Sequence, residues 1–354
     1  MSSAGPEFTY AASGVDIDAG ERAVTLMRTA VEATNRPEVV GGLGGFAGLF
    51  ALDTERYRRP LLASSTDGVG TKIALARQLD RHDTVGIDLV AMVVDDLVAC
   101  GAEPLFLQDY VACGRVVPER IAAIVTGIAT GCRLAGAALV GGETAEHGDL
   151  MAPDDYDLAA TAVGVVEADA VLGPERVRDG DAVVAMASSG FHSNGYSLVR
   201  RVVAAAGLDL AATPAGLDRS LGEVLLEPTR IYALDCLALV QRFGVEGVHA
   251  YAHITGGGLA GNTARVVPDG LEAVLDRGTW ALPAAVSLLE EHGVPRTESE
   301  RAFNCGVGMV AAVAPDVADE VVAVLAERGV PAWVAGTVGA RTGEDAARLV
   351  GSYR

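Results

Sequence analysis

The sequence is poor in positive charge, in aromatic residues and in long apolar runs. It has 27 Lys and Arg against 47 Asp and Glu, which gives a formal net charge of −20 at pH 7. Nucleic acids and anionic membranes would be repelled by such a charge, so the balance argues against either as a general partner. It leaves room for a small phosphorylated substrate, because a few donors and a divalent metal are enough to bind one. The longest apolar runs, such as residues 307–314, have the length of a strand rather than of a membrane span.

The cysteines are few, odd in number and scattered. There are 5, with no C-x-x-C pair among them, and we predict that they are free thiols of a protein in the reducing cytoplasm. Residues 1–10 lack a basic region followed by an apolar core, so we predict no secretory signal peptide.

A chain of 354 residues exceeds one typical core and fits two domains. Turn signals cluster at residues 172–181, and we place the boundary there, with domains 1–172 and 173–354. Strands and helices alternate in both halves, which predicts α/β or α+β layers. Strands are predicted at 60–65, 105–111, 137–140, 158–166, 182–187, 307–313 and 332–338. Helices are predicted at 20–35, 86–100, 118–135, from about 194, 228–243, 262–267, 282–292 and 315–328.

The clearest phosphate-handling feature is the stretch 66–72, which follows the predicted strand 60–65. Its sequence is Thr-Asp-Gly-Val-Gly-Thr-Lys, and its glycines let backbone amides approach a phosphate. Asp67 is a candidate magnesium ligand, and Lys72 is a candidate partner for phosphate charge. The G-x-x-x-x-G-K spacing of a Walker loop is absent. An ordinary tight turn with an Asp cap is an equally good interpretation of this stretch alone.

Three carboxylates, Asp88, Asp95 and Asp96, lie in the otherwise apolar segment 86–97. If the segment is helical, Asp88 and Asp95 share a face. Apolar surroundings make such carboxylates costly unless a cation neutralises them. The alternative is a solvated helix edge, since Asp is mostly exposed.

Another carboxylate, Glu143, follows the predicted strand 137–140 in the run Gly-Gly-Glu-Thr-Ala-Glu. Strand ends are common ligand sites in α/β folds. Together with Asp67, Asp95 or Asp96, and Asp109, it supplies hard oxygen ligands of the kind magnesium takes, without the Cys/His cluster that zinc prefers.

Glycine is concentrated in residues 41–48. The G-x-G-x-x-A pattern within them lacks a preceding strand, so a dinucleotide fingerprint is rejected. We predict a loop that closes over phosphates, with plain backbone mobility as the alternative. Its candidate ligand residues are Gly41, Gly42, Gly44 and Gly45.

Two loops of the second half carry polar groups between a strand and a helix. The first contains Ser189, Gly190, His192, Ser193 and Asn194, whose donors suit a phosphate at a helix N-terminus. His192 is a candidate proton carrier near neutral pH. A structural, hydrogen-bonded imidazole is the alternative role for either histidine. The second loop contains His253, Thr255, Gly256 and Gly257.

These stretches match a known family in its order along the chain. From residue 10 to about 339 the sequence resembles the phosphoribosylformylglycinamidine cyclo-ligase (aminoimidazole ribonucleotide synthetase) family of purine biosynthesis. The matching stretches are 14–20, 36–39, 41–46, 66–72, 83–89, 101–106, 141–146, 188–200, 228–232, 253–259 and 303–309.

The resemblance implies an ATP-dependent ring closure of formylglycinamidine ribonucleotide to aminoimidazole ribonucleotide. It also implies a two-domain fold of the aminoimidazole ribonucleotide synthetase type, a homodimer formed through the N-terminal sheets, and ATP on the N-terminal domain. By this resemblance, residues 41–48 and Asp67, Gly68, Gly70, Thr71 and Lys72 serve ATP. Asp67, Asp96 and Glu143 hold Mg²⁺, the loops at 189–194 and 253–257 face the ribonucleotide, and His192, Asp96 and Lys72 are the catalytic candidates.

The chain departs from the family pattern at two places. The family commonly has Asn-Asp where this chain has Asp95-Asp96, and Met-Pro-Gly where it has the run 147–151. The alternative to an enzyme is a catalytically silent nucleotide-binding relative, which has little need of so many clustered carboxylates.

Overall fold

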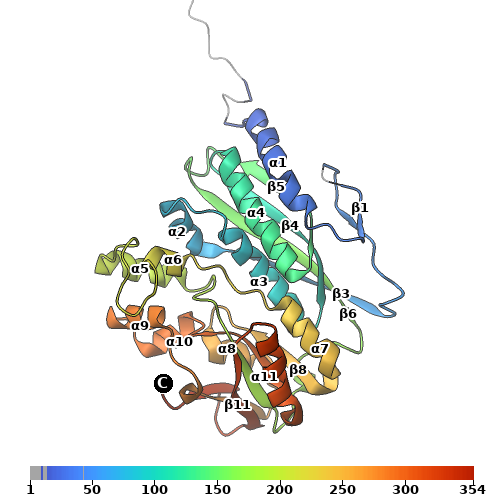
Figure 1. The fold of residues 1–354 in the computed structure, drawn as a ribbon, viewed down its shortest axis with the longest axis vertical. Helices are drawn as coiled ribbons and strands as arrows, with labels where there is room; N and C mark the ends of the chain where they lie inside the picture. The colour runs from blue at the N-terminus through green and yellow to red at the C-terminus, as the bar shows by residue number, and fades with distance from the viewer. Residues whose placement is uncertain (1–8, 11–13, 43) are drawn as a thin grey trace, which may run out of the picture.

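A computed structural model describes residues 9–10, 14–42 and 44–354 of the chain (Figure 1). Leu43 of the glycine-rich stretch and most of residues 1–10, for which we predict no signal peptide, lie outside the described residues. Within the described ranges, no helix is both long enough and apolar enough to cross a membrane.

The N-terminal half contains a four-stranded sheet with helices on one face (Figure 1). Its order is β3-β6-β4-β5, and all neighbours are antiparallel except the parallel pair β4–β5. The strands are β3 (Pro60–Gly68), β4 (Glu103–Cys113), β5 (Ala138–Glu146) and β6 (Tyr156–Glu167). The helices are α1 (Ile17–Glu32), α2 (Ile73–Gln78), α3 (Val85–Ala99) and α4 (Pro118–Ala135), and a hairpin of β1 (Val39–Val40) and β2 (Leu49–Phe50) flanks the glycine-rich stretch.

The C-terminal half is built on a six-stranded mixed sheet of order β12-β9-β11-β7-β10-β8. Its strands are β7 (Ala182–Ala187), β8 (Val248–His253), β9 (Leu271–Asp276), β10 (Val307–Val313), β11 (Ala332–Ala340) and β12 (Ala347–Val350). Its helices are α5 (Tyr196–Ala206), α6 (Leu221–Leu225), α7 (Ala233–Gly247), α8 (Gly258–Ala264), α9 (Ala284–Glu291), α10 (Arg296–Ala302) and α11 (Ala318–Glu327).

Helix α3 is apolar almost throughout because it is covered on several sides. It packs against the N-terminal sheet, against α4, and against α7 and β8 of the C-terminal half. Close approach of α3 and α4 depends on Gly86, since a Cβ there would lie 2.3 Å from the backbone nitrogen of Ile128. Helix α4 begins with Pro118 in its first turn and ends at Gly136 with φ 70°, as its sequence predicts. Thus α3 lies between the two halves of the chain.

The predicted two-domain α+β fold is confirmed, and most predicted elements occur within a few residues of their predicted bounds. Three predictions are wrong. The stretch 66–72, predicted to follow a strand that ends at residue 65, begins inside β3, which continues to Gly68. The strand predicted at 137–140 continues to Glu146, so Glu143 lies within a strand rather than at its end. The helix predicted at 262–267 is α8, which begins at Gly258 because two successive glycines with positive φ turn the chain there. The predicted boundary at 172/173 falls between β6 and β7 and stays a prediction.

Candidate functional site

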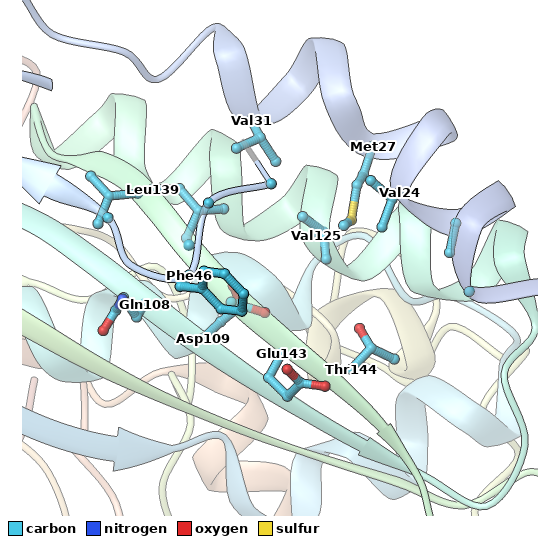
Figure 2. A pocket seen from close by; sticks show the side chains of 18 of the residues that line it. Val24, Met27, Val31, Phe46, Gln108, Asp109, Val125, Leu139, Glu143 and Thr144 are labelled. Atoms are coloured by element: carbon cyan, nitrogen blue, oxygen red, sulfur yellow. The ribbon is translucent and has the colours of Figure 1, made fainter. Parts of the chain in front are cut away.

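A cavity of about 480 Å³ lies at the edge of the N-terminal sheet, between α1, α4, the glycine-rich stretch and β5 (Figure 2). One wall is apolar and carries Val24 and Met27 of α1 and Val125 of α4. The opposite wall carries polar side chains of β4 and β5, among them Asp109 and Glu143. The predicted ligand residues Gly42, Gly44 and Gly45 also line it, whereas Gly41 does not. The cavity therefore has an apolar side suited to a flat ring and an acidic side.

Asp109 is the most unusual polar group of this cavity. Its carboxyl has no side-chain hydrogen-bond partner and no nearby cation among the described residues, and burial raises its pKa to about 7. A Cβ on the neighbouring Gly142 would lie 2.2 Å from the Oδ1 atom of Asp109. The glycine in the Gly-Gly-Glu run thus makes room for this carboxyl.

The stretch 67–72, called the loop 67–72 below, begins with Asp67 and Gly68, the last two residues of β3, and continues through a short 3₁₀ turn at Gly70–Lys72. Asp67 is exposed, and its Oδ1 accepts a hydrogen bond of 2.7 Å from the backbone N–H of Gly68. Gly70 has a φ of 73°, which a residue with a Cβ rarely adopts. Asp67 and Thr71 are open to solvent and available to a ligand.

Lys72, at the end of the same loop, points the other way. It is fully buried, and its Nζ donates to the Oδ1 of Asp88 at 2.8 Å, to the carbonyl of His192 at 3.0 Å and to the carbonyl of Glu227 at 2.6 Å. Three acceptors match the three donors of a protonated ammonium group. The predicted contact of Lys72 with phosphate would require it to leave all three.

The three carboxylates of α3 differ in environment. Asp88 is fully buried, and besides Lys72 its Oδ1 accepts from the backbone N–H and the hydroxyl of Thr229. The predicted neutralising cation is therefore present for Asp88. Asp95 is also fully buried, and no Lys or Arg of the described residues pairs with it. Its Oδ1 accepts from the N–H of Tyr232 at 2.9 Å, and burial raises its pKa to about 7. A solvated helix edge is thus the wrong interpretation for Asp88 and Asp95.

Asp96 lies where α3 contacts β8 of the C-terminal half. Its side chain is 45% exposed, and its Oδ1 contacts the Nδ1 of His253 at 3.0 Å. Burial opposes ionisation, but the hydrogen bond and charge of His253 outweigh it and lower the pKa of Asp96. Asp96 therefore stays ionised at neutral pH, as a metal ligand must.

The predicted magnesium ligands are Asp67, Asp96 and Glu143. Within the described part of the chain, no three or more His, Cys, Asp or Glu side chains gather closely enough to hold a metal. All three carboxylates are exposed and offer only oxygen, but they are not brought together: Asp96 lies near Ser65 of β3, the strand of Asp67, whereas Glu143 is on β5 at the opposite edge of the sheet. This donor set fits Mg²⁺, which takes one or two protein carboxylates and completes its shell with waters and substrate phosphates.

The loop 189–194 connects β7 to α5 and holds His192 in an unusual backbone conformation. His192 has a φ of 63° and is buried, and its Nε2 accepts from the N–H of Ser189 at 3.2 Å. Burial lowers the pKa of His192 well below its usual value, so the imidazole is neutral at pH 7. This argues against the predicted role as a proton carrier near neutral pH.

Two asparagines that we did not single out shape the loops of the C-terminal half. Asn304 donates to the carbonyl of Gly190 at 2.8 Å. Asn262 is buried, and its Nδ2 lies within 3.2 Å of the carbonyls of Thr255, Gly256 and Gly258. Asn304 lies inside the matching stretch 303–309 and Asn262 three residues after the stretch 253–259, but nothing in their spacing marks them as loop supports.

Comparison with known proteins agrees with the two-domain α+β fold. The family models described as "AIR synthase related protein", N-terminal and C-terminal domain, match residues 51–166 and 178–347. A thiamine-monophosphate kinase from Stenotrophomonas maltophilia K279a has a similar structure, with a TM-score of 0.67 and 19% identity over 94% of this chain and 97% of that one. The hydrogenase maturation protein HypE in complex with ATP also has a TM-score of 0.67, at 20% identity over 96% of this chain and 93% of its own. These identities show a shared fold only.

Closer relatives narrow the class. A phosphoribosylformylglycinamidine cyclo-ligase of Anaeromyxobacter sp. (strain Fw109-5) is 52% identical over 347 residues, or 97% of this chain and 99% of the relative. The protein of the same name from Geobacillus kaustophilus (strain HTA426) is 52% identical over 331 residues, or 93% and 95% of the two chains. The chain belongs to the phosphoribosylformylglycinamidine cyclo-ligase family, as its motifs predict.

Proposed function

We propose that the chain catalyses the ATP-dependent closure of formylglycinamidine ribonucleotide to 5-aminoimidazole ribonucleotide, a step of purine biosynthesis. The γ-phosphoryl group of ATP is transferred to the formyl-amide oxygen, which becomes a leaving group. The amidine nitrogen then attacks the formyl carbon that carries this oxygen. The attack closes the five-membered ring, and the oxygen leaves as phosphate. The observation that carries the proposal is the 52% identity over 97% of the chain to a relative named for this reaction.

The cavity of Figure 2 is our candidate site for the base of ATP. A purine ring would lie against Val24, Met27 and Val125, and its exocyclic amino group would find an acceptor in Asp109. Glu143 on the same wall would meet the phosphates through a Mg²⁺ ion bound between them. The backbone amides of Gly41, Gly42, Gly44 and Gly45 would then contact the phosphates. Gly68, Gly70 and Thr71, which the family resemblance also assigns to ATP, lie at the end of β3 on the opposite edge of the sheet and do not line this cavity within one chain.

Mg²⁺ is the cofactor that these residues fit, with Asp67, Asp96 and Glu143 as proposed ligands. When bound, it neutralises the phosphate oxygens during transfer. Phosphoryl transfer needs positioned donors rather than a protein nucleophile, and ring closure needs the amidine held near the activated carbon. The exposed carboxylates and the two loops of the C-terminal half are the residues proposed to meet these two needs.

The ribonucleotide is assigned to the loops 189–194 and 253–258. Ser189, Gly190, Ser193 and Asn194 form the first. His253, Thr255, Gly256 and Gly257 belong to the second, in which His253 is buried and the two glycines are exposed. Asn262 and Asn304 hold their carbonyls and are positioning residues. His192 takes part as a neutral imidazole because of its lowered pKa.

A homodimer is proposed through the open face of the N-terminal sheet. Leu62 on β3 is 67% exposed, and Tyr110 on β4 is 41% exposed although its neighbours Asp109 and Val111 are buried. Large apolar groups on a sheet face are commonly covered by a partner. We also propose a cytoplasmic location, in keeping with five free cysteines.

The function is tested with purified protein, magnesium-ATP and formylglycinamidine ribonucleotide. We expect aminoimidazole ribonucleotide and ADP to appear in equal amounts. A protein that binds ATP but forms neither product is the catalytically silent relative, and this outcome would refute the enzyme.

A further inference from the structure

Three contacts join the loop 67–72 of the N-terminal half to the loop 189–194 and the start of α5 in the C-terminal half. The hydroxyl of Ser193 donates to the carbonyl of Val69 at 2.7 Å. The hydroxyls of Thr71 and Ser197 lie 3.1 Å apart. In the third contact, the ammonium group of Lys72 donates to the carbonyl of His192 at 3.0 Å. Lys72 is the one charged donor among these three contacts. In the proposed function these two loops face different substrates.

Lys72 is held on the N-terminal side by a rigid element. Its partner Asp88 lies on α3, and both side chains are fully buried. The same Asp88 oxygen accepts two hydrogen bonds from Thr229 of the C-terminal half, at 2.8 Å and 2.6 Å. An ammonium group in this place keeps its hydrogen bonds, because leaving them would strand two buried charges.

The contact fixes a strained residue. His192 has a φ of 63°, a conformation that costs a non-glycine residue free energy unless its surroundings impose it. Lys72 holds its carbonyl, and the N–H of Ser189 holds its ring. Displacement of Lys72 would release the backbone of the loop that is proposed to bind the ribonucleotide.

We propose that Lys72 is a positioning residue that couples the loop 67–72 to the loop 189–194, so that nucleotide and ribonucleotide bind synergistically. This rests on the proposed function, since it assigns one substrate to each loop. The loop with Asp67 and Thr71 is on the solvent side of Lys72 and the loop with His192 is on its other side. A nucleotide that orders the loop 67–72 therefore lowers the entropic cost of ordering the loop 189–194. By the same coupling, a ribonucleotide that orders the loop 189–194 favours binding of the nucleotide.

The test is equilibrium binding by calorimetry to the full chain, with a non-hydrolysable ATP analogue and magnesium, with and without saturating formylglycinamidine ribonucleotide. We expect the ribonucleotide to tighten binding of the analogue by about fivefold or more in the wild type, within the usual range of such coupling. In Lys72→Met we expect this factor to fall below about twofold. We also expect kcat to fall by a larger factor than the factor by which the KM of either substrate changes.

Two further variants separate coupling from stability. Thr229→Val removes a hydrogen bond from the same Asp88 oxygen but does not touch His192, so it lowers Tm and keeps the coupling. Ser197→Ala removes the contact with Thr71 from an exposed position, so it keeps Tm and lowers the coupling by about twofold. If Lys72→Met does not fold, the binding coupling measured in Ser197→Ala tests the proposal instead.

Several results would overturn the proposal. One is a wild type that turns over but binds its two substrates independently, an outcome that leaves the enzymatic function intact. Another is a folded Lys72→Met with wild-type coupling, or an unchanged coupling in Ser197→Ala if Lys72→Met is unfolded. A third is an equal loss of coupling in Thr229→Val, because general destabilisation would then explain it.

Discussion

The edge of the N-terminal sheet and the junction between the two halves both carry carboxylates, but in opposite environments. Asp67 on β3 and Glu143 on β5 lie on the two opposite edge strands of this sheet, and both are exposed, with no Lys or Arg partner among the described residues. At the junction, Asp88 is fully buried and accepts three hydrogen bonds through one oxygen. Groups that are open and unneutralised are available to metal and phosphate, whereas buried and bonded groups hold the halves together. The difference predicts that edge variants lose turnover and junction variants lose stability.

The largest effect is expected from Asp88→Ala. This change leaves the Lys72 ammonium buried without its counter-charge, which costs about 3–5 kcal/mol of the free energy of unfolding. Urea denaturation measures it. The control is Asp269→Ala, at an exposed position, with an expected change within about 0.5 kcal/mol. A similar small change in Asp88→Ala would mean that the junction does not depend on this pair.

Asp95→Asn is expected to stabilise the protein at high pH. Burial raises the pKa of Asp95 from 3.8 to about 7, so between these values the folded state holds a proton that the unfolded state has lost. The stability contributed by this proton is complete below about pH 4 and is lost as pH rises to about 7. The neutral Asn avoids that loss, and we expect a gain on the order of 2 kcal/mol at pH 8.

Urea denaturation of both proteins at pH 5 and pH 8, without magnesium, checks this prediction. The gain should be much smaller at pH 5 than at pH 8. An equal difference at both values would show that Asp95 is ionised throughout.

Asp67→Asn is expected to lower turnover at least about tenfold, or about 1.4 kcal/mol in the activation free energy. Its free energy of unfolding should change by less than about 0.5 kcal/mol, because the side chain is exposed. The rate is measured across a magnesium titration, and more magnesium should restore part of it. Rates equal to the wild type at every magnesium concentration would refute the assignment of Asp67 as a ligand.

The smallest effect is expected from Met27→Ala on the apolar wall of the cavity. Loss of about one to two methylene contacts should raise the KM for ATP about fivefold with kcat unchanged. The matched control is Leu26→Ala, the neighbouring residue on α1, which is 48% exposed and does not line the cavity. Equal effects of the two variants would argue against a base in this cavity.

Much of the fold could be predicted because its signals are local. Helix α4 begins at a proline and ends at a glycine, and β7 and β10 are short apolar runs between turns. The extension of β5 through Gly141 and Gly142 could not be predicted in this way. Glycines favour a turn by propensity, and only pairing with β4 keeps them extended.

The candidate site was predictable in its composition but not in the placement of its residues. The sequence identifies Asp67, Lys72 and Asp88 as charged residues in unusual surroundings. It does not reveal that Lys72 turns away from its own loop to meet Asp88, since this depends on how the C-terminal half packs on α3. For the same reason Asn262 was not identified, because its three carbonyl contacts exist only once the loop around it is folded.

The central claim, that the nucleotide binds at the edge of the N-terminal sheet and not at the junction, is tested most directly by a crystal structure with a non-hydrolysable ATP analogue and magnesium. We predict the base between Met27 and Asp109, the metal on Asp67, Asp96 or Glu143, and Lys72 still bonded to Asp88. A base outside this cavity, or phosphates bound by Lys72 in place of Asp88, would contradict the account.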